Sequence, residues 1–140
     1  MLADISEHCN TIEECYEFML AYAAQGLPSD QESQSGTQLR EFLHRAVDAV
    51  SGLAGSYLAA VTQEDVEPAD RYQAFLAVLE RDANDSLAAL GLVLAQPAIS
   101  SQLIDNLNAS IHLRALLTDL FLIDEIIKAH QIAEQPASAN

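Results

Sequence analysis

The sequence predicts an all-α protein, an antiparallel four-helix bundle in up-down-up-down order. Apolar residues recur at intervals of three and four through four long stretches, which is the period of one helix face. Polar segments that contain glycine or proline separate these stretches. The sequence shows no strand-like alternation, internal repeat or glycine-rich phosphate loop. We therefore expect one helical domain over residues 1–134, followed by a frayed tail at 135–140.

The first helix is expected over residues 4–25, because an apolar face runs through it and glutamates occupy the opposite face. Gly26 ends this helix, and the polar segment 26–36 predicts a mobile loop. The apolar face is formed by Leu2, Ile5, Cys9, Ile12, Tyr16, Met19 and Ala23.

The second helix is expected over residues 37–61, with Thr37 as its N-cap, and the third over residues 70–95, ahead of Pro97. The eight residues from 62 to 69 connect them. This connector reaches at most about 29 Å, whereas a helix of 25 residues is about 37 Å long. The second and third helices should therefore be antiparallel neighbours. The core face of the second helix comprises Leu39, Leu43, Ala46, Val50, Leu53, Tyr57 and Val61.

The fourth helix is expected over residues 98–130, with a bend allowed around 106–110. Between Ile111 and Ile127 its apolar residues occupy nearly the whole circumference. A four-helix bundle cannot enclose one of its own members completely, so the uncovered surface predicts a partner, most simply a second copy of the chain. The residues expected at this interface are Leu113, Leu116, Leu117, Leu120, Phe121, Ile123 and Ile127.

The composition combines a net charge of -15 with 50% hydrophobic residues. Disordered chains pair high charge with low hydrophobicity, so this chain is expected to fold. Nucleic acids and anionic membrane surfaces bind clustered lysines and arginines, which 6 basic residues against 21 acidic ones do not provide. We therefore expect neither partner. Charged residues interrupt the most apolar run, which excludes it as a membrane span.

The two cysteines, Cys9 and Cys15, lie six residues apart on one expected helix, where they cannot easily form a disulfide. The N-terminus is acidic and does not read as a secretory leader. Both observations favour a reducing, cytoplasmic location. Cys9 is expected to be a small buried hydrophobe, and the glutamates around Cys15 should disfavour its thiolate.

A candidate metal motif lies on the second helix. Glu41 and His44 have the Glu-x-x-His spacing that directs a carboxylate and an imidazole to one metal ion. Through this pair the chain resembles a shortened, degenerate bacterioferritin, of the kind encoded near carboxysome genes. The resemblance implies a ferritin-like di-iron site and iron as cofactor. Ala109 stands where that family has a glutamate. The ligands that the resemblance implies are Glu14 (or Glu13), Glu41, His44, Glu80 and His112.

Helical geometry argues against this metal site. At 100° per residue, Glu41 and His44 point almost opposite to the core face of their helix, whereas a di-iron centre lies inside the bundle. The short connector 62–69 also leaves no room for the long crossover of ferritins. The alternative is a solvated helix face. An exposed His44 would also suit a histidine phosphotransfer domain, but Val47 and Asp48 stand where that family has lysine and glycine.

The function expected from the sequence is that of a non-catalytic, acidic interaction or assembly protein without a cofactor. It would form a homo-oligomer through its fourth helix and present carboxylate-rich faces to another protein. The bacterioferritin-like iron protein is the alternative, with ferroxidase activity only under that hypothesis. The histidine phosphotransfer domain is a more distant third.

Overall fold

The computed structural model describes residues 2–63 and 66–134, and it leaves the side chains of residues 2, 3, 127 and 130–134 undescribed. The predicted all-α class is confirmed, because every regular element in the described residues is a helix. The predicted frayed tail at 135–140 lies outside them. The helices are α1 (Leu2–Ala24), α2 (Gln34–Gln63), α3 (Ala69–Leu94), α4 (Ser101–Ala109) and α5 (Ile111–Glu134).

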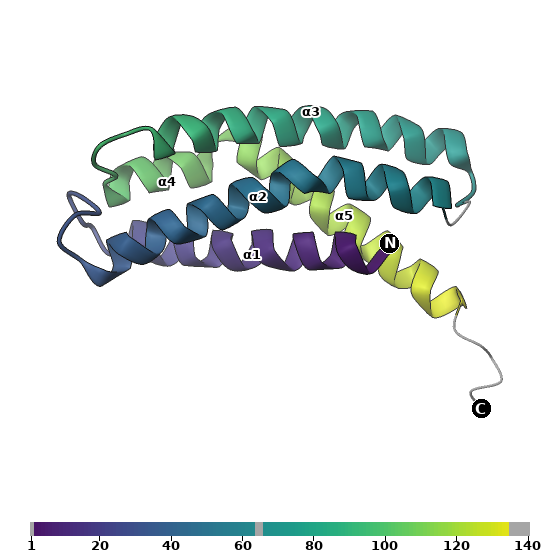
Figure 1. Ribbon diagram of the computed structural model, residues 1–140, viewed down its shortest axis with the longest axis horizontal. Helices are drawn as coiled ribbons and strands as arrows, with labels where there is room; N and C mark the ends of the chain where they lie inside the picture. The colour runs from purple at the N-terminus through teal and green to yellow at the C-terminus, as the bar shows by residue number, and fades with distance from the viewer. Residues whose placement is uncertain (1, 64–65, 135–140) are drawn as a thin grey trace.

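The helices pack in a ring. Helix α1 packs against α2, α2 against α3, and α4 and α5 together close the ring between α3 and α1. Helices α1, α2 and α3 run in alternating directions, and α4 begins at the end of the molecule where α3 ends (Figure 1). Helix α5 is inclined to the others: it begins beside α3 and ends beyond the N-terminus of α1. None of these helices is long and apolar enough to cross a membrane within the described residues.

The fourth predicted helix is two helices that meet at Ser110, inside the range where the bend was allowed. Ser110 has an extended backbone, with φ of -63° and ψ of 142°, which interrupts the helical hydrogen bonds. Its N–H donates to Leu107 O at the end of α4, and its hydroxyl accepts a hydrogen bond from Leu113 N at the start of α5. One serine therefore ends α4 and caps α5, and this sets the inclination of α5.

The start of α2 differs from the prediction. Helix α2 begins three residues before Thr37, and Ser33 is the cap: its hydroxyl accepts a hydrogen bond from Gly36 N at 2.9 Å. Thr37 lies inside the helix, where its N–H donates to Ser33 O. A serine four residues before the threonine satisfies the free N–H groups earlier, so the predicted N-cap was wrong. Gly26 does end α1, with the positive φ of 66° that glycine adopts easily.

The segment between α1 and α2, predicted to be a mobile loop, is held at both ends. Leu27 N donates to Ser101 Oγ, and Ser101 N donates to Leu27 O, each at 2.8 Å. Asp30 is buried and accepts hydrogen bonds from Arg40 Nε and from Ile99 N. These contacts join the segment to α2 and to the start of α4. The prediction of a mobile loop was therefore wrong, because the anchoring residues are about 70 positions apart in sequence.

Gly36 tests how tightly this segment is packed. A Cβ on Gly36 would lie 1.7 Å from the backbone oxygen of Asp30, and backbone cannot move aside cheaply. We expect Gly36→Ala to lower the free energy of unfolding by about 1–3 kcal/mol or more. Gly55 is the matched control, because nothing lies within 4 Å of its Cβ position in the middle of α2. Gly55→Ala should raise stability by about 0.5–1 kcal/mol. Urea denaturation followed by circular dichroism measures both, and equal shifts would contradict the close approach.

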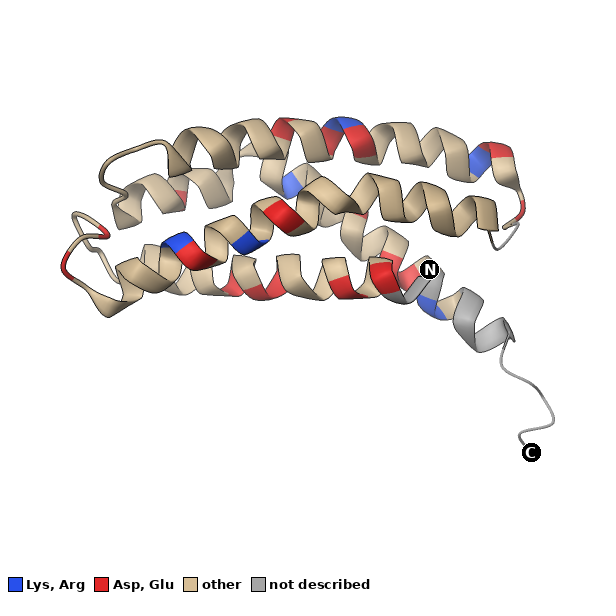
Figure 2. Ribbon diagram, viewed as in Figure 1, with Lys and Arg blue, Asp and Glu red and all other residues tan. Residues whose placement is uncertain are grey.

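Charged side chains are unevenly distributed along the helices (Figure 2). Acidic residues lie along α1, the first half of α2 and the middle of α3. Several stretches contain no charged residue, among them 18–24 on α1, 49–63 on α2, 72–79 and 86–94 on α3, and 120–123 on α5. One uncharged region lies where the stretches 49–63, 72–79 and 120–123 come together.

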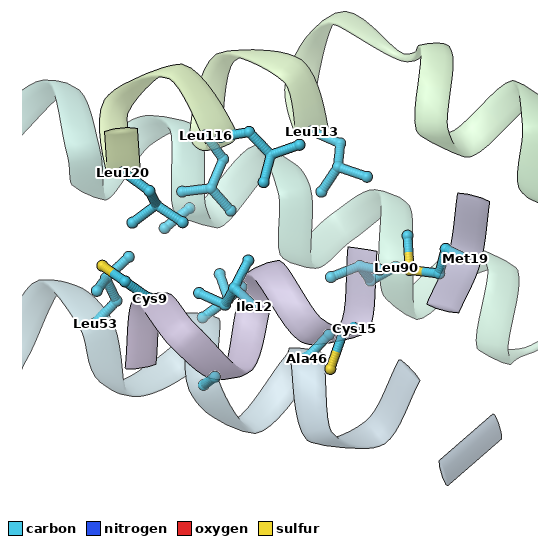
Figure 3. Close-up of a cluster of buried hydrophobic side chains, with 14 of the residues drawn as sticks. Cys9, Ile12, Cys15, Met19, Ala46, Leu53, Leu90, Leu113, Leu116 and Leu120 are labelled. Carbon is cyan, nitrogen blue, oxygen red and sulfur yellow. The ribbon is translucent and has the colours of Figure 1, made fainter. Parts of the chain in front are cut away.

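The hydrophobic core lies inside the ring of helices (Figure 3). In it Leu116 and Leu120 of α5 face Cys9 and Ile12 of α1. This corrects the predicted interface, because five of its seven residues belong to the core of a single chain. Helix α5 is inclined, so one side of its apolar circumference covers α1 and only the rest reaches solvent. The five residues withdrawn from the interface are Leu113, Leu116, Leu117, Leu120 and Ile123.

Phe121 is the one predicted interface residue that the structure places at the surface, with 60% of its side chain exposed. The side chain of Ile127 lies outside the described residues. Three further apolar side chains of α5 are also exposed, Ile111 at the start of the helix and Leu122 and Ile126 near Phe121. The exposed apolar surface of α5 therefore centres on residues 121–126.

Candidate functional site

The two residues of the candidate metal motif, Glu41 and His44, lie on the outer face of α2. Both are exposed, as the helical projection predicts, while Leu39 and Leu43 of the same helix are fully buried. Glu14 on α1 forms an exposed ion pair with Arg45, with 3.3 Å between its Oε2 and Nη2. This carboxylate therefore pairs with a guanidinium, not with His44.

The remaining implied ligands lie on other helices. Glu80 is exposed on α3, and His112 at the start of α5 has its Nδ1 3.9 Å from Asp85 Oδ2. Over the residues that the structure describes, no three His, Cys, Asp or Glu side chains are grouped so that they could hold a metal ion. These five residues do not fit a di-iron centre, so we assign no chemistry to one.

The cysteines provide no nucleophile. Cys9 and Cys15 are both free and buried. Burial, with Asp124 and Glu13 nearby, raises the pKa of the Cys9 thiol to about 12, and burial also raises the pKa of Cys15. Both are therefore thiols at neutral pH, and they pack as small apolar side chains.

The strongest candidate site is an apolar groove between α2, α3 and α5. Its volume is about 370 Å³. Tyr57 of α2 is a buried lining residue, with the Phe75 ring at 6.5 Å in edge-to-face geometry and the Tyr72 ring at 6.4 Å. Burial raises the pKa of Tyr57 to about 12, so its hydroxyl is protonated at neutral pH. We call this the α2–α3–α5 groove; it is lined by Tyr57, Arg71, Tyr72, Phe75, Leu122 and Ile126.

The inclination of α5 explains why the groove is open. The buried residues of α3 begin only at Leu79, so its first ten residues have no helix covering them completely. Tyr72 and Phe75 in this part are half-buried. Within the described residues no Cα atom of α2 lies within 8 Å of a Cα atom of α5, although side chains of both helices line the groove. The groove is therefore the end of the core that α5 leaves uncovered as it departs from α3.

The groove also coincides with the uncharged region. Its aromatic and aliphatic lining residues come from the charge-free stretches of α2, α3 and α5, apart from Ile126, which follows Asp124 and Glu125. Arg71 is the one charged lining residue, and it lies at the start of α3. An apolar surface without carboxylates is typical of a contact site in a protein that is acidic elsewhere.

A pair of aspartates lies next to the groove. Asp119 of α5 is 8% exposed, and its Oδ2 is buried without a hydrogen-bond partner. Burial raises the pKa of Asp119 to about 7, and the neighbouring Asp82 carboxyl of α3 adds to this shift through hydrogen bonding and charge. His112 and Asp119 lie on the same helix, but each is next to a different aspartate of α3, Asp85 and Asp82 respectively.

No protein-family model matches the chain, and no curated protein or solved structure matches it. The residues of the site therefore carry the functional argument by themselves.

The apolar period placed Tyr57 on the core face of the second helix and gave no sign of an opening beside it. Tyr57, Tyr72 and Phe75 follow the helical apolar period, which cannot distinguish a covered face from an uncovered one. The signal that could have located the site was the run of charge-free residues 49–63 facing 72–79 across a short connector.

Proposed function

We propose that this protein is a non-catalytic assembly module that self-associates through the α2–α3–α5 groove and the exposed apolar residues of α5. Its fold is then an antiparallel up-down-up-down four-helix bundle in which α4 and α5 together form the fourth member. The carboxylate-rich outer faces of α1, α2 and α3 stay available to another protein. The observation that carries the proposal is an uncharged apolar groove bordered by exposed apolar side chains on a chain of net charge -15.

Electrostatics favours this surface as the point of contact between two copies. Like charges brought together across an interface are destabilising, and two copies of this chain repel each other over most of their surfaces. This repulsion is weak at the charge-free stretches of α2, α3 and α5 that line the groove. Apolar burial can act there without the cost of desolvating carboxylates.

The surface also offers parts that can fit a second copy of itself. A two-fold interface brings the same patch of both copies together, so a side chain that projects from the patch can enter a recess of that patch on the partner. Phe121 is 60% exposed on α5, next to Leu122 in the groove lining. A ring of this size can enter the partner's aromatic groove in both directions at once. Aromatic anchors in apolar recesses dominate the energy of such contacts.

Sedimentation velocity over roughly 1–200 µM protein tests the proposal, a range that covers the micromolar dissociation constants of modest interfaces. We expect the native protein to shift from one 15.2 kDa copy toward a dimer as concentration rises. Leu122→Glu should abolish this shift, because it places a carboxylate of each copy in the contact. Leu92→Glu is the matched control, since Leu92 is 68% exposed on α3 and outside the groove.

The proposal fails if the native protein remains a single copy at every concentration. It also fails if Leu92→Glu reduces association as much as Leu122→Glu, because a general increase in negative charge would then explain both results.

A further inference from the structure

The lining of the groove continues directly into the aspartate pair. On α5, Asp119, Leu122 and Ile126 are three and seven residues apart, so they share one face of the helix. On α3, Phe75, Leu79 and Asp82 share a face in the same way. The two faces run antiparallel, because Ser86 of α3 donates to the carbonyl of His112 earlier on α5. The aspartates therefore meet immediately before α5 departs from α3 and the groove opens.

We propose that Asp82 and Asp119 form a proton-controlled contact between α3 and α5 that sets the width of the α2–α3–α5 groove. The contact is closed when the pair holds a proton and opens when both carboxyls are ionised. Opening of this contact would regulate self-association. Only this consequence rests on the proposed function.

The chemistry of the pair supports this behaviour. Two carboxyl groups can lie together when one is protonated, whereas two carboxylates in a poorly solvated place repel each other. The Oδ2 atom of Asp119 has no partner to compensate an added charge. Because the pKa of Asp119 is raised in the folded protein, its stabilising contribution is complete in acid and is lost as the pH rises through about 7. The α3–α5 contact should therefore weaken above neutral pH.

The other charged groups around α5 do not take the place of Asp82 in raising the pKa of Asp119. On α1, Glu13 and Cys9 lie near the later part of α5. The charge of Glu13 contributes to the raised pKa of Lys128, and the charge of Asp124 contributes to the raised pKa of Cys9. Asp124 itself lies 3.0 Å from Lys128. Further titratable or charged groups on the helices that pack against α5, or on α5 itself, include Glu80, Arg81 and Asp85 on α3, Asp105 on α4, and His112, Arg114 and Glu125 on α5. Among the charged groups only Asp82 contributes to the shift of Asp119.

Nuclear Overhauser effects within the groove give a direct test in the full-length protein. Methyl protons of Leu122 and Ile126 should show effects to the Phe75 ring at about pH 5, where the pair is protonated. These effects should be lost at about pH 9, with a midpoint near 7. Asp119→Asn removes the titrating group, so the nuclear Overhauser effects of this variant should persist from about pH 5 to about pH 9.

Asp82→Asn provides a second variant in case Asp119→Asn does not fold. It removes the neighbouring charge and should move the midpoint to lower pH, because the repulsion that raises the pKa of Asp119 disappears. Nuclear Overhauser effects in the groove that stay constant with pH in the native protein overturn the proposal. So does a transition that is unchanged in both variants, because another group would then control it.

Sedimentation at the same two pH values separates this inference from the proposed function. An open groove should strengthen association at about pH 9 over about pH 5, whereas net charge alone would favour association nearer the pI of 4.2. If the groove effects titrate as expected but no association occurs at either pH, the proton-controlled contact stands and self-association is rejected.

Discussion

Replacing Arg40 with alanine is expected to lower the free energy of unfolding by about 2–5 kcal/mol, because it leaves a buried carboxylate without its hydrogen-bonded partner. The Asp30 carboxylate is buried and would lose the guanidinium that neutralises it. Arg40 also donates to the carbonyls of Leu94 and Gln96, at 3.2 and 2.9 Å, at the end of α3. These carbonyls have no helical partner of their own, so one substitution disrupts the loop before α2 and the end of α3 together.

Arg45→Ala is the matched control for Arg40→Ala. Its ion pair with Glu14 joins α2 to α1, but both side chains are about half exposed. Exposed pairs contribute about 0.2–1 kcal/mol, so this variant should be nearly as stable as the native protein. Chemical denaturation followed by circular dichroism compares the two. Similar small losses of unfolding free energy in the two variants would show that Arg40 does not hold the loop before α2 against the end of α3.

The pH dependence of the Arg40 variant gives an independent check. Burial alone would raise the pKa of Asp30, but hydrogen bonds from Arg40 and from Ile99 N, with the charge of Arg40, lower it below its ordinary value. A lowered pKa means that the stabilisation is complete above the ordinary carboxyl range and disappears as the pH falls through the folded pKa. The difference in stability between native and Arg40→Ala protein should therefore shrink in acid, below about pH 4.

The helices themselves could be predicted from the sequence, because each has an apolar period that neighbouring residues determine. The outward position of Glu41 and His44 followed from the same geometry, and both are exposed. The anchoring of the first loop could not be predicted. Asp30 is polar, and its partner Ile99 N is 69 positions away in sequence. The residues next to Asp30 therefore indicate only a polar segment.

The groove escaped prediction for a different reason. Its existence depends on the direction of α5, which the extended backbone of Ser110 sets. The sequence showed that the region from Ile111 to Ile127 is apolar all round, but not which side of it would cover α1. It therefore placed Leu116 and Leu120 at an interface and left Leu122 without a role. The distinction between these faces is a tertiary property, and a matched pair of leucine variants tests it.

Leu120→Ala is expected to lower the free energy of unfolding by about 2–5 kcal/mol. Leu120 is fully buried among side chains of α1 and α5, so the substitution removes apolar contacts and leaves a cavity in the core (Figure 3). Leu122→Ala removes the same atoms two residues later on the same helix. Because Leu122 is 51% exposed in the groove lining, its loss should cost about 1 kcal/mol or less in a single copy.

Both variants should be measured by urea denaturation at protein concentrations too low for association, and by sedimentation at high concentration. Leu120→Ala should lose stability and still associate wherever it is folded. Leu122→Ala should keep its stability and associate more weakly, because its side chain contributes to the contact between copies and not to the core. The reverse pattern, with the larger loss of stability at Leu122, would mean that α5 packs with its other face inward. The interface would then include Leu120 after all, and the groove would not exist as described.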